Sequence, residues 1–158
     1  MTTWADFQTQ APELAAKVAA RLAAHKHHVL ATLRADGSPR VSGTEVHRHG
    51  DVLTLGSMPG AAKARDLQRD GRFALHTNPG EHTMEGGDSK LSGTAREVRD
   101  ASELAAFREH AEQIPDGPFH LFVLDLLEVV HTAVSDGGDH LVIECWRPVA
   151  GVSTVARY

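Results

Sequence analysis

Residues 28–57, HVLATLRADGSPRVSGTEVHRHGDVLTLGS, decide the fold class of this chain of 158 residues. Within them, the apolar run VLATL (29–33), the alternating stretch RVSGTEVHR (40–48) and the run VLTLGS (52–57) each predict a β-strand. The connecting segments ADGSP and HGD are rich in the residues that tight turns prefer. The stretch therefore predicts an antiparallel meander of three strands.

The rest of the chain adds more strands and a few helices. Periodicity and turn signals predict helices over 12–26, 61–70 and 100–114, and strands over 72–77, 90–98, 120–134 and 140–148, with an extended tail from 149. The run 120–134 is almost continuously apolar, so a buried helix is the alternative for part of it. Many antiparallel strands with few helices predict a mainly β (α+β) fold, a small closed or split barrel that leaves few exposed sheet edges. Length and composition fit one domain over residues 1–158.

Net charge, cysteine content and the length of apolar runs indicate which kinds of partner and compartment to expect. A formal net charge of -5 gives no overall positive field for nucleic acid. The single cysteine, Cys145, excludes an internal disulfide and fits a reducing compartment. The beginning of the sequence lacks the pattern of a secretory signal, and no apolar run is long enough to cross a bilayer. We therefore expect a cytoplasmic protein that binds neither nucleic acid nor membrane.

Histidine is frequent, with 11 in the chain. His25, His27 and His28 lie close together, but no cysteine or carboxylate follows at a metal-ligand spacing, and histidines suit the end of a helix. We therefore predict no metal site. His47 and His49 flank an arginine near a turn, and we expect them to be exposed.

A basic segment, LGSMPGAAKARDLQRD (55–70), is the first candidate for a binding site. Pro59 and Gly60 turn the chain, and a helix is expected to begin just after them, where unpaired amides carry partial positive charge. Lys63 and Arg65 add full charges, and a serine at position 57 adds a hydroxyl. This combination suits a phosphate group. A solvated helix face is the alternative interpretation.

Several motifs in order resemble the pyridoxamine 5'-phosphate oxidase-like split-barrel family of flavin-binding proteins. These motifs are LAT-x-x-x-DG-x-P on the first hairpin, a strand that ends in small polar residues, and K-x-R-x-L-x-R-D-x-R leading into a strand. The similarity covers most of the chain and is greatest to the actinobacterial branch with deazaflavin-dependent reductases. It implies a split β-barrel homodimer with two cofactors at the interface. It also implies hydride transfer to or from a small-molecule substrate.

The resemblance assigns cofactor-binding roles to individual residues. Lys63 matches the family's phosphate-binding lysine, and Arg65 matches a basic residue of the deazaflavin branch. Contacts to the phosphate or ribityl chain are implied for Ser57 and Met58. Backbone contacts to the isoalloxazine ring are implied for Val41, Ser42, Gly43 and Thr44. Ala62 stands where the pyridoxal-phosphate enzymes often carry arginine, which argues against pyridoxamine phosphate oxidase activity.

Two further residues are candidates for cofactor binding, and each also has a purely structural interpretation. Lys90, with Ser92, begins a strand and is a candidate to line the cofactor groove, but a solvated strand edge fits it equally well. Trp146 is a candidate to cover the cofactor from the second subunit, although a place in the core or dimer interface is more usual for tryptophan. No side chain stands out as a catalytic acid or base.

FMN is the expected cofactor because the family as a whole uses it, and the deazaflavin coenzyme F-420 is the alternative. The deazaflavin has a long acidic tail and needs a longer basic groove, for which Arg69, Lys17 and Arg21 are candidates. A binding or sequestering protein without turnover is a second hypothesis. A haem-binding relative on the same barrel is a third. The role of the glycine-rich loop at 79–89 stays open.

Overall fold

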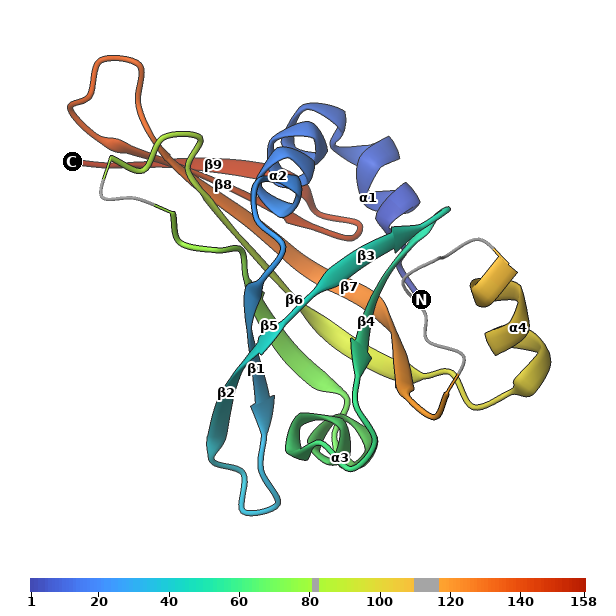
Figure 1. Ribbon diagram of the computed structural model, residues 1–158. Helices are drawn as coiled ribbons and strands as arrows, with labels where there is room; N and C mark the ends of the chain where they lie inside the picture. Colours follow the sequence, from blue (N-terminus) through green and yellow to red (C-terminus); the bar gives the residue numbers. More distant parts are fainter. Residues whose placement is uncertain (81–82, 110–116) are drawn as a thin grey trace.

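The computed structural model describes residues 1–80, 83–109 and 117–158. Within them, nine antiparallel strands form one sheet in the order β2-β1-β5-β6-β7-β4-β3, and β7 also pairs with β8, which pairs with β9 (Figure 1). The strands are β1 (His28–Leu33), β2 (Pro39–Thr44), β3 (Val46–His49), β4 (Val52–Ser57), β5 (Arg72–His76), β6 (Asp88–Glu97), β7 (His120–Val134), β8 (Leu141–Arg147) and β9 (Gly151–Arg157). The helices are α1 (Trp4–Gln10), α2 (Pro12–Ala24), α3 (Ala62–Arg69) and α4 (Ala101–Glu109).

The sheet closes on itself through Glu45. The strands β2 and β3 stand at opposite ends of the strand order, yet this single residue joins them. The stretch 40–48, predicted as one strand, is therefore two: Gly43 of β2 pairs with Val29, while Val46 of β3 pairs with Leu55. Both hairpins of the predicted meander are present, since β1 pairs with β2 and β3 pairs with β4. In the described part of the chain no ladder joins β2 to β4, so the middle strand of the prediction is divided between the two ends of the sheet. The predicted fold class, a mainly β split barrel, is confirmed.

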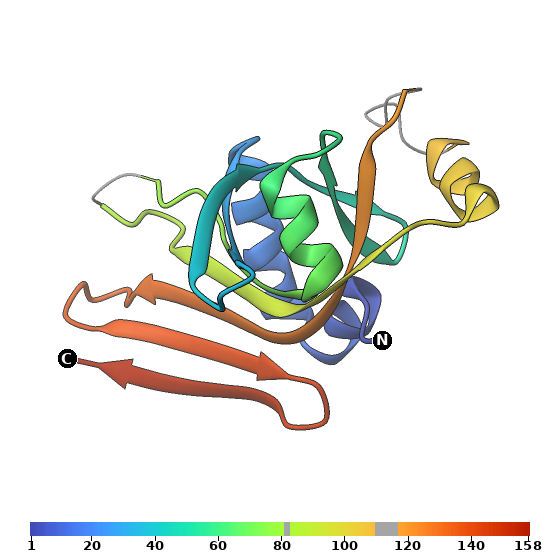
Figure 2. The same ribbon diagram turned by 90° about the horizontal axis from the view of Figure 1, so that it is seen from below.

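The two N-terminal helices cover one side of the sheet (Figures 1 and 2). The Thr3 hydroxyl accepts a hydrogen bond from the Asp6 amide, and the Asp6 carboxylate accepts one from the Thr3 amide, which is a capping box that starts α1. Phe7 of α1 is fully buried, and its ring centroid lies 4.8 Å from that of Trp146. The sequence prediction missed α1, because its few apolar residues show too little periodicity before Pro12.

Most other elements agree with the sequence. Residues 120–134 form one strand, β7, so the alternative of a buried helix there is wrong. The tail is extended as expected and adds β9 to the sheet. The predicted helix at 100–114 is present as α4, and residues 110–114 lie outside the described residues. None of the helices in the described ranges combines the length and apolar character needed to cross a membrane.

A buried carboxylate fixes α3 to the barrel. The Oδ2 atom of Asp66 accepts hydrogen bonds from Thr32 of β1 at 2.8 Å and from Arg40 of β2 at 2.6 Å. Arg69 donates to the other oxygen at 3.1 Å. Burial alone would raise the pKa of Asp66, but these hydrogen bonds outweigh it and hold the pKa below its usual value. The charged form of Asp66 therefore ties α3 to the first hairpin.

Replacing Asp66 with asparagine is expected to lower the free energy of unfolding by about 1–3 kcal/mol, because Arg40 loses its charged partner. The folded-state pKa of Asp66 lies below its unfolded value of about 3.9. Its contribution is thus complete above about pH 4 and is lost as the pH falls through the folded-state pKa. Urea unfolding at about pH 7 and about pH 3 measures both effects.

Asp70→Asn is the matched control, since Asp70 ends the same helix but forms an exposed pair with Arg72. This change is expected to cost less than Asp66→Asn. Equal losses in the two variants would show that the buried carboxylate has no special role.

Candidate functional site

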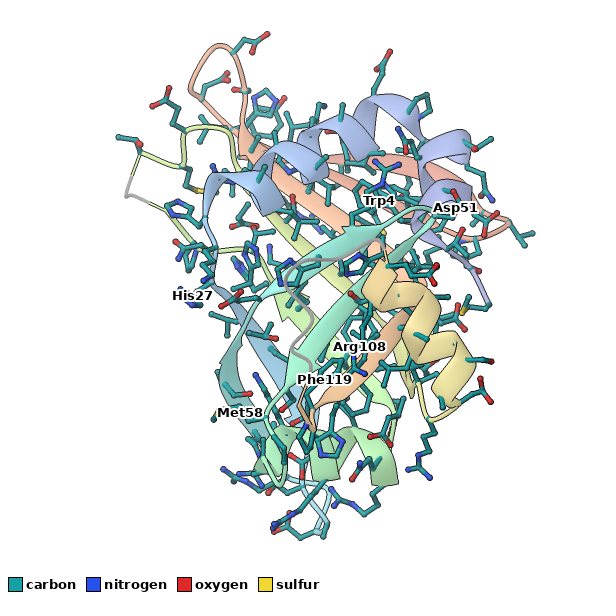
Figure 3. All side chains as sticks on the ribbon, turned by 45° about the vertical axis from the view of Figure 1, so that its right-hand side comes forward. Trp4, His27, Asp51, Met58, Arg108 and Phe119 are labelled. Carbon is teal, nitrogen blue, oxygen red and sulfur yellow. The ribbon has the colours of Figure 1, made fainter. Side chains whose placement is uncertain are left out.

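A cavity of about 450 Å³ lies where the barrel is split, between the end of β2 and strand β4. Figure 3 labels His27, Met58 and Phe119, which reach it from three separate segments. The residues that line the cavity are His27, Gly43, Thr44, Glu45, His47, His49, Thr54, Gly56, Ser57, Met58, Pro59, Ala61, Lys63, Pro118, Phe119 and Leu121. The described residues thus give the cavity a polar end near α3, a histidine end on β3 and an apolar side beside β7.

The polar end is built by the turn from β4 into α3. Gly60 takes a φ of +72°, which glycine adopts without strain, and α3 begins two residues later. No side chain caps this helix, and among the described residues the amides of Ala62 and Lys63 have no hydrogen-bond partner. The hydroxyl of Ser57 is buried, with the residue only 8% exposed, and it too lacks a partner in the described chain. Buried hydroxyls are normally satisfied, so Ser57 marks a place where a ligand fits.

Lys63 places a positive charge at the same end. Its Nζ atom donates to the backbone carbonyl of Gly43 at 2.7 Å and so reaches across from α3 to β2. Burial lowers the pKa of the Lys63 ammonium, and the nearby Glu45 carboxylate opposes that change. A partly desolvated ammonium of this kind interacts strongly with an anion.

The middle of the cavity presents backbone rather than side chains. Gly43 on β2 and Gly56 on β4 both line it, and a Cβ atom built on either residue meets nothing within 4 Å. The two glycines therefore leave open space over two strands, where a flat ring can approach the main chain. Phe119 and Leu121 add an apolar surface nearby.

The far end carries two histidines on one face of β3. The rings of His47 and His49 are 6.2 Å apart between centroids, and His47 lies 3.6 Å from Glu45. His49 packs edge-on against Phe107 of α4, with centroids 5.8 Å apart. Burial, followed by the neighbouring His47, lowers the pKa of His49. His49 has no hydrogen-bond or ion-pair partner among the described residues, and the lowered pKa favours its neutral form at the edge of the cavity.

The structure brings together half of the residues predicted for the site. The predicted residues that line the cavity are Gly43, Thr44, Ser57, Met58 and Lys63. Val41 and Ser42 lie earlier on β2 and do not line it, and Arg65 is exposed with its guanidinium 3.5 Å from the Cβ position of Gly60. Lys90 pairs with Asp88 on β6. Trp146 is fully buried in the hydrophobic core, as its alternative interpretation held.

The histidine end was missed from the sequence. His47 and His49 were expected to be exposed, but both are half-buried and line the cavity. Their spacing of two residues on a strand, which places them on one face, was the available signal. The closely spaced His25 and His28 do not line the cavity, and among the described residues no group of three or more histidines, cysteines and carboxylates could hold a metal ion.

The strand order, with its two ends joined through Glu45, defines an antiparallel split barrel. The chain belongs to the pyridoxamine 5'-phosphate oxidase family, whose sequence profile matches residues 14–133. No curated protein matches the chain.

Solved structures share the fold at low sequence identity. A pyridoxamine 5'-phosphate oxidase-related, FMN-binding protein from Nostoc punctiforme has a TM-score of 0.64 and 13% identity, over 94% of this chain and 96% of that one. PhzG from Burkholderia lata has a TM-score of 0.63 and 18% identity, over 87% of this chain and 86% of that one. A haem-binding protein from Mycobacterium smegmatis has a TM-score of 0.55 and 16% identity, over 90% and 87%.

Proposed function

We propose that the cavity binds FMN and that the protein is a flavin-dependent oxidoreductase, which transfers a hydride to or from a small organic substrate. The observation that carries this proposal is the position of Lys63 and the unpartnered hydroxyl of Ser57 at one end of a glycine-lined cavity. The FMN-binding relative from Nostoc punctiforme, which has the same fold, supports the choice of cofactor.

The polar end suits a phosphate group. Lys63 offers a charge-assisted hydrogen bond, Ser57 offers its hydroxyl, and the uncapped start of α3 beside the cavity carries partial positive charge. Three independent kinds of donor at one place are more specific than a lone basic residue.

The glycine-lined middle suits the flavin ring. A planar ring can lie over Gly43 and Gly56 and form hydrogen bonds with the backbone of β2, an edge strand. When bound, the ring supplies the hydride chemistry, and the protein binds it, orients it and excludes water through apolar residues such as Phe119 and Leu121. Chemistry of this kind does not require a catalytic side chain of the protein.

The deazaflavin coenzyme F-420 is the alternative cofactor, and side chains that its acidic tail would need are engaged elsewhere. Arg69 donates to the carbonyl of Leu33 and to Asp66. Lys17 pairs with Glu144, and Arg21 donates to backbone carbonyls of the loop after β5. None of these three side chains lines the cavity, which favours FMN.

Lys63→Met is expected to weaken FMN binding by about 1–3 kcal/mol, because the phosphate loses a charge-assisted hydrogen bond. Quenching of flavin fluorescence measures the affinity, with a parallel titration of coenzyme F-420. Arg65→Met is the matched control, since it removes an exposed charge on the same helix. Unchanged FMN affinity in the Lys63 variant would remove Lys63 from the site. Turnover of the bound flavin with an electron acceptor separates an enzyme from a sequestering protein.

We also propose that the protein is a homodimer that uses the side of β7, β8 and β9 opposite the N-terminal helices. Figure 2 shows no helix on this side of the red and orange strands. The strand register places four side chains on this side of the sheet, and they are only partly buried: Val130, Ile143, Cys145 and Val155. An uncovered apolar sheet face of this kind fits a second copy of the chain.

Val155→Asp is expected to shift the protein from dimer to monomer, because a charge would enter the interface. Val152→Asp is the matched control: Val152 is on the same strand and is equally exposed, at 45% against 43%, but it pairs with Trp146 on the opposite face. Light scattering gives the mass of each variant. A monomeric wild-type protein would contradict the proposal.

Haem is a second candidate ligand of the same cavity, favoured by the unpartnered imidazole of His49. A neutral histidine is the usual axial ligand of haem iron, and burial lowers the pKa of His49, which favours that form. If haem binds, adding hemin to the wild type is expected to give a Soret band. That band is expected to shift or disappear in the His49→Phe variant. His140→Phe is the control, because His140 lies outside the cavity. No Soret shift on adding hemin to the wild type would exclude this function.

A further inference from the structure

The ammonium of Lys63 is already engaged in the absence of a ligand. Its Nζ atom donates to the carbonyl oxygen of Gly43 at 2.7 Å. Gly43 belongs to β2, which ends the strand order, so one edge of this strand has no neighbouring strand. Both residues line the cavity. One hydrogen bond therefore links the end that suits a phosphate to the strand that suits a ring.

The hydrogen bond from Lys63 occupies the carbonyl oxygen of Gly43, an acceptor that a bound flavin ring could use. A flavin ring carries an imide N–H, and the backbone acceptors of an edge strand are natural partners for it. While Lys63 occupies the carbonyl of Gly43, a ring N–H has to compete with an ammonium. An ammonium is the stronger donor because it carries a full charge.

A phosphate changes that balance. A bond from an ammonium to a backbone carbonyl is already charge-assisted, and a phosphate adds the attraction of a second, opposite full charge. Lys63 is therefore expected to exchange the carbonyl of Gly43 for a phosphate oxygen, with Ser57 contributing its unpartnered hydroxyl. The carbonyl then becomes free to accept from the ring.

We infer that Lys63 selects phosphorylated flavins twice over: it attracts the phosphate, and it blocks the carbonyl of Gly43 until a phosphate draws it away. The inference rests on the proposed binding of FMN in this cavity. It makes Lys63 a specificity-determining residue that couples the two ends of the ligand. Because the coupling is thermodynamic, phosphate and ring each strengthen the binding of the other by the same factor.

Lys63→Met tests the block directly, with riboflavin as a flavin that has no phosphate. The variant is expected to bind FMN more weakly than the wild type but riboflavin about three- to tenfold more tightly, the range that one freed hydrogen bond provides. Arg65→Met is the control, and its riboflavin affinity is expected to stay at the wild-type value. Fluorescence quenching reports both ligands, and circular dichroism checks that each variant is folded.

Inorganic phosphate provides a second test that uses the wild-type chain alone. Phosphate is expected to tighten riboflavin binding to the wild type by about three- to tenfold and to leave the folded Lys63→Met variant unaffected. Sulfate of equal ionic strength is expected to act in the same direction, whereas chloride is expected to have no effect.

The outcomes separate this inference from the proposed function. If the wild type binds FMN but riboflavin affinity neither rises in Lys63→Met nor responds to phosphate, the block at Gly43 is overturned and the FMN site stands. If the wild type binds neither FMN nor riboflavin, the proposed function fails and the inference fails with it. Tighter riboflavin binding in the Lys63 variant alone, and not in the Arg65 variant, supports the inference.

Discussion

The arrangement of this molecule depends on the buried carboxylate of Asp66. It accepts hydrogen bonds from Thr32 on β1 and Arg40 on β2, so it holds α3 against the turn end of the first hairpin. Lys63 lies one helical turn earlier on α3, and its reach to Gly43 depends on where that helix sits. An ion pair that stabilises the barrel thus also positions the charged group of the cavity.

The split of the barrel provides the rest of the site. If β2 paired with β4, their backbone groups would be used in a ladder and no cavity would lie between them. The bend at Glu45 instead sends β3 to the far end of the strand order and leaves β2 as an edge. A ligand then meets backbone from β2 and side chains from β3 and β4 at once. Unused edges, which usually favour aggregation, are here placed at a binding cavity.

Local patterns were sufficient to predict most elements and the polar end of the site. Alternation and turn residues located the strands, and the Pro59–Gly60 turn before a basic helix located Ser57 and Lys63. The division of 40–48 into two strands was not available, because a bend at one glutamate leaves no mark on the periodicity of that stretch. His47 and His49 were missed for a different reason. Their strand, β3, pairs with β4 in a local hairpin. The cavity that they line also includes Lys63 and Phe119 from distant segments, and that approach is a long-range property.

The two ends of the cavity differ in how tightly their residues are packed and held. At the α3 end, a buried hydroxyl and a half-buried ammonium lie together and suit one anionic group. At the β3 end, the imidazole of His49 packs against Phe107 of α4, a helix in which no described side chain is fully buried. Sparse packing permits adjustment, whereas the α3 end is held by a charged network. The geometry therefore favours a firmly anchored helix beside the proposed phosphate site and an adjustable end at β3.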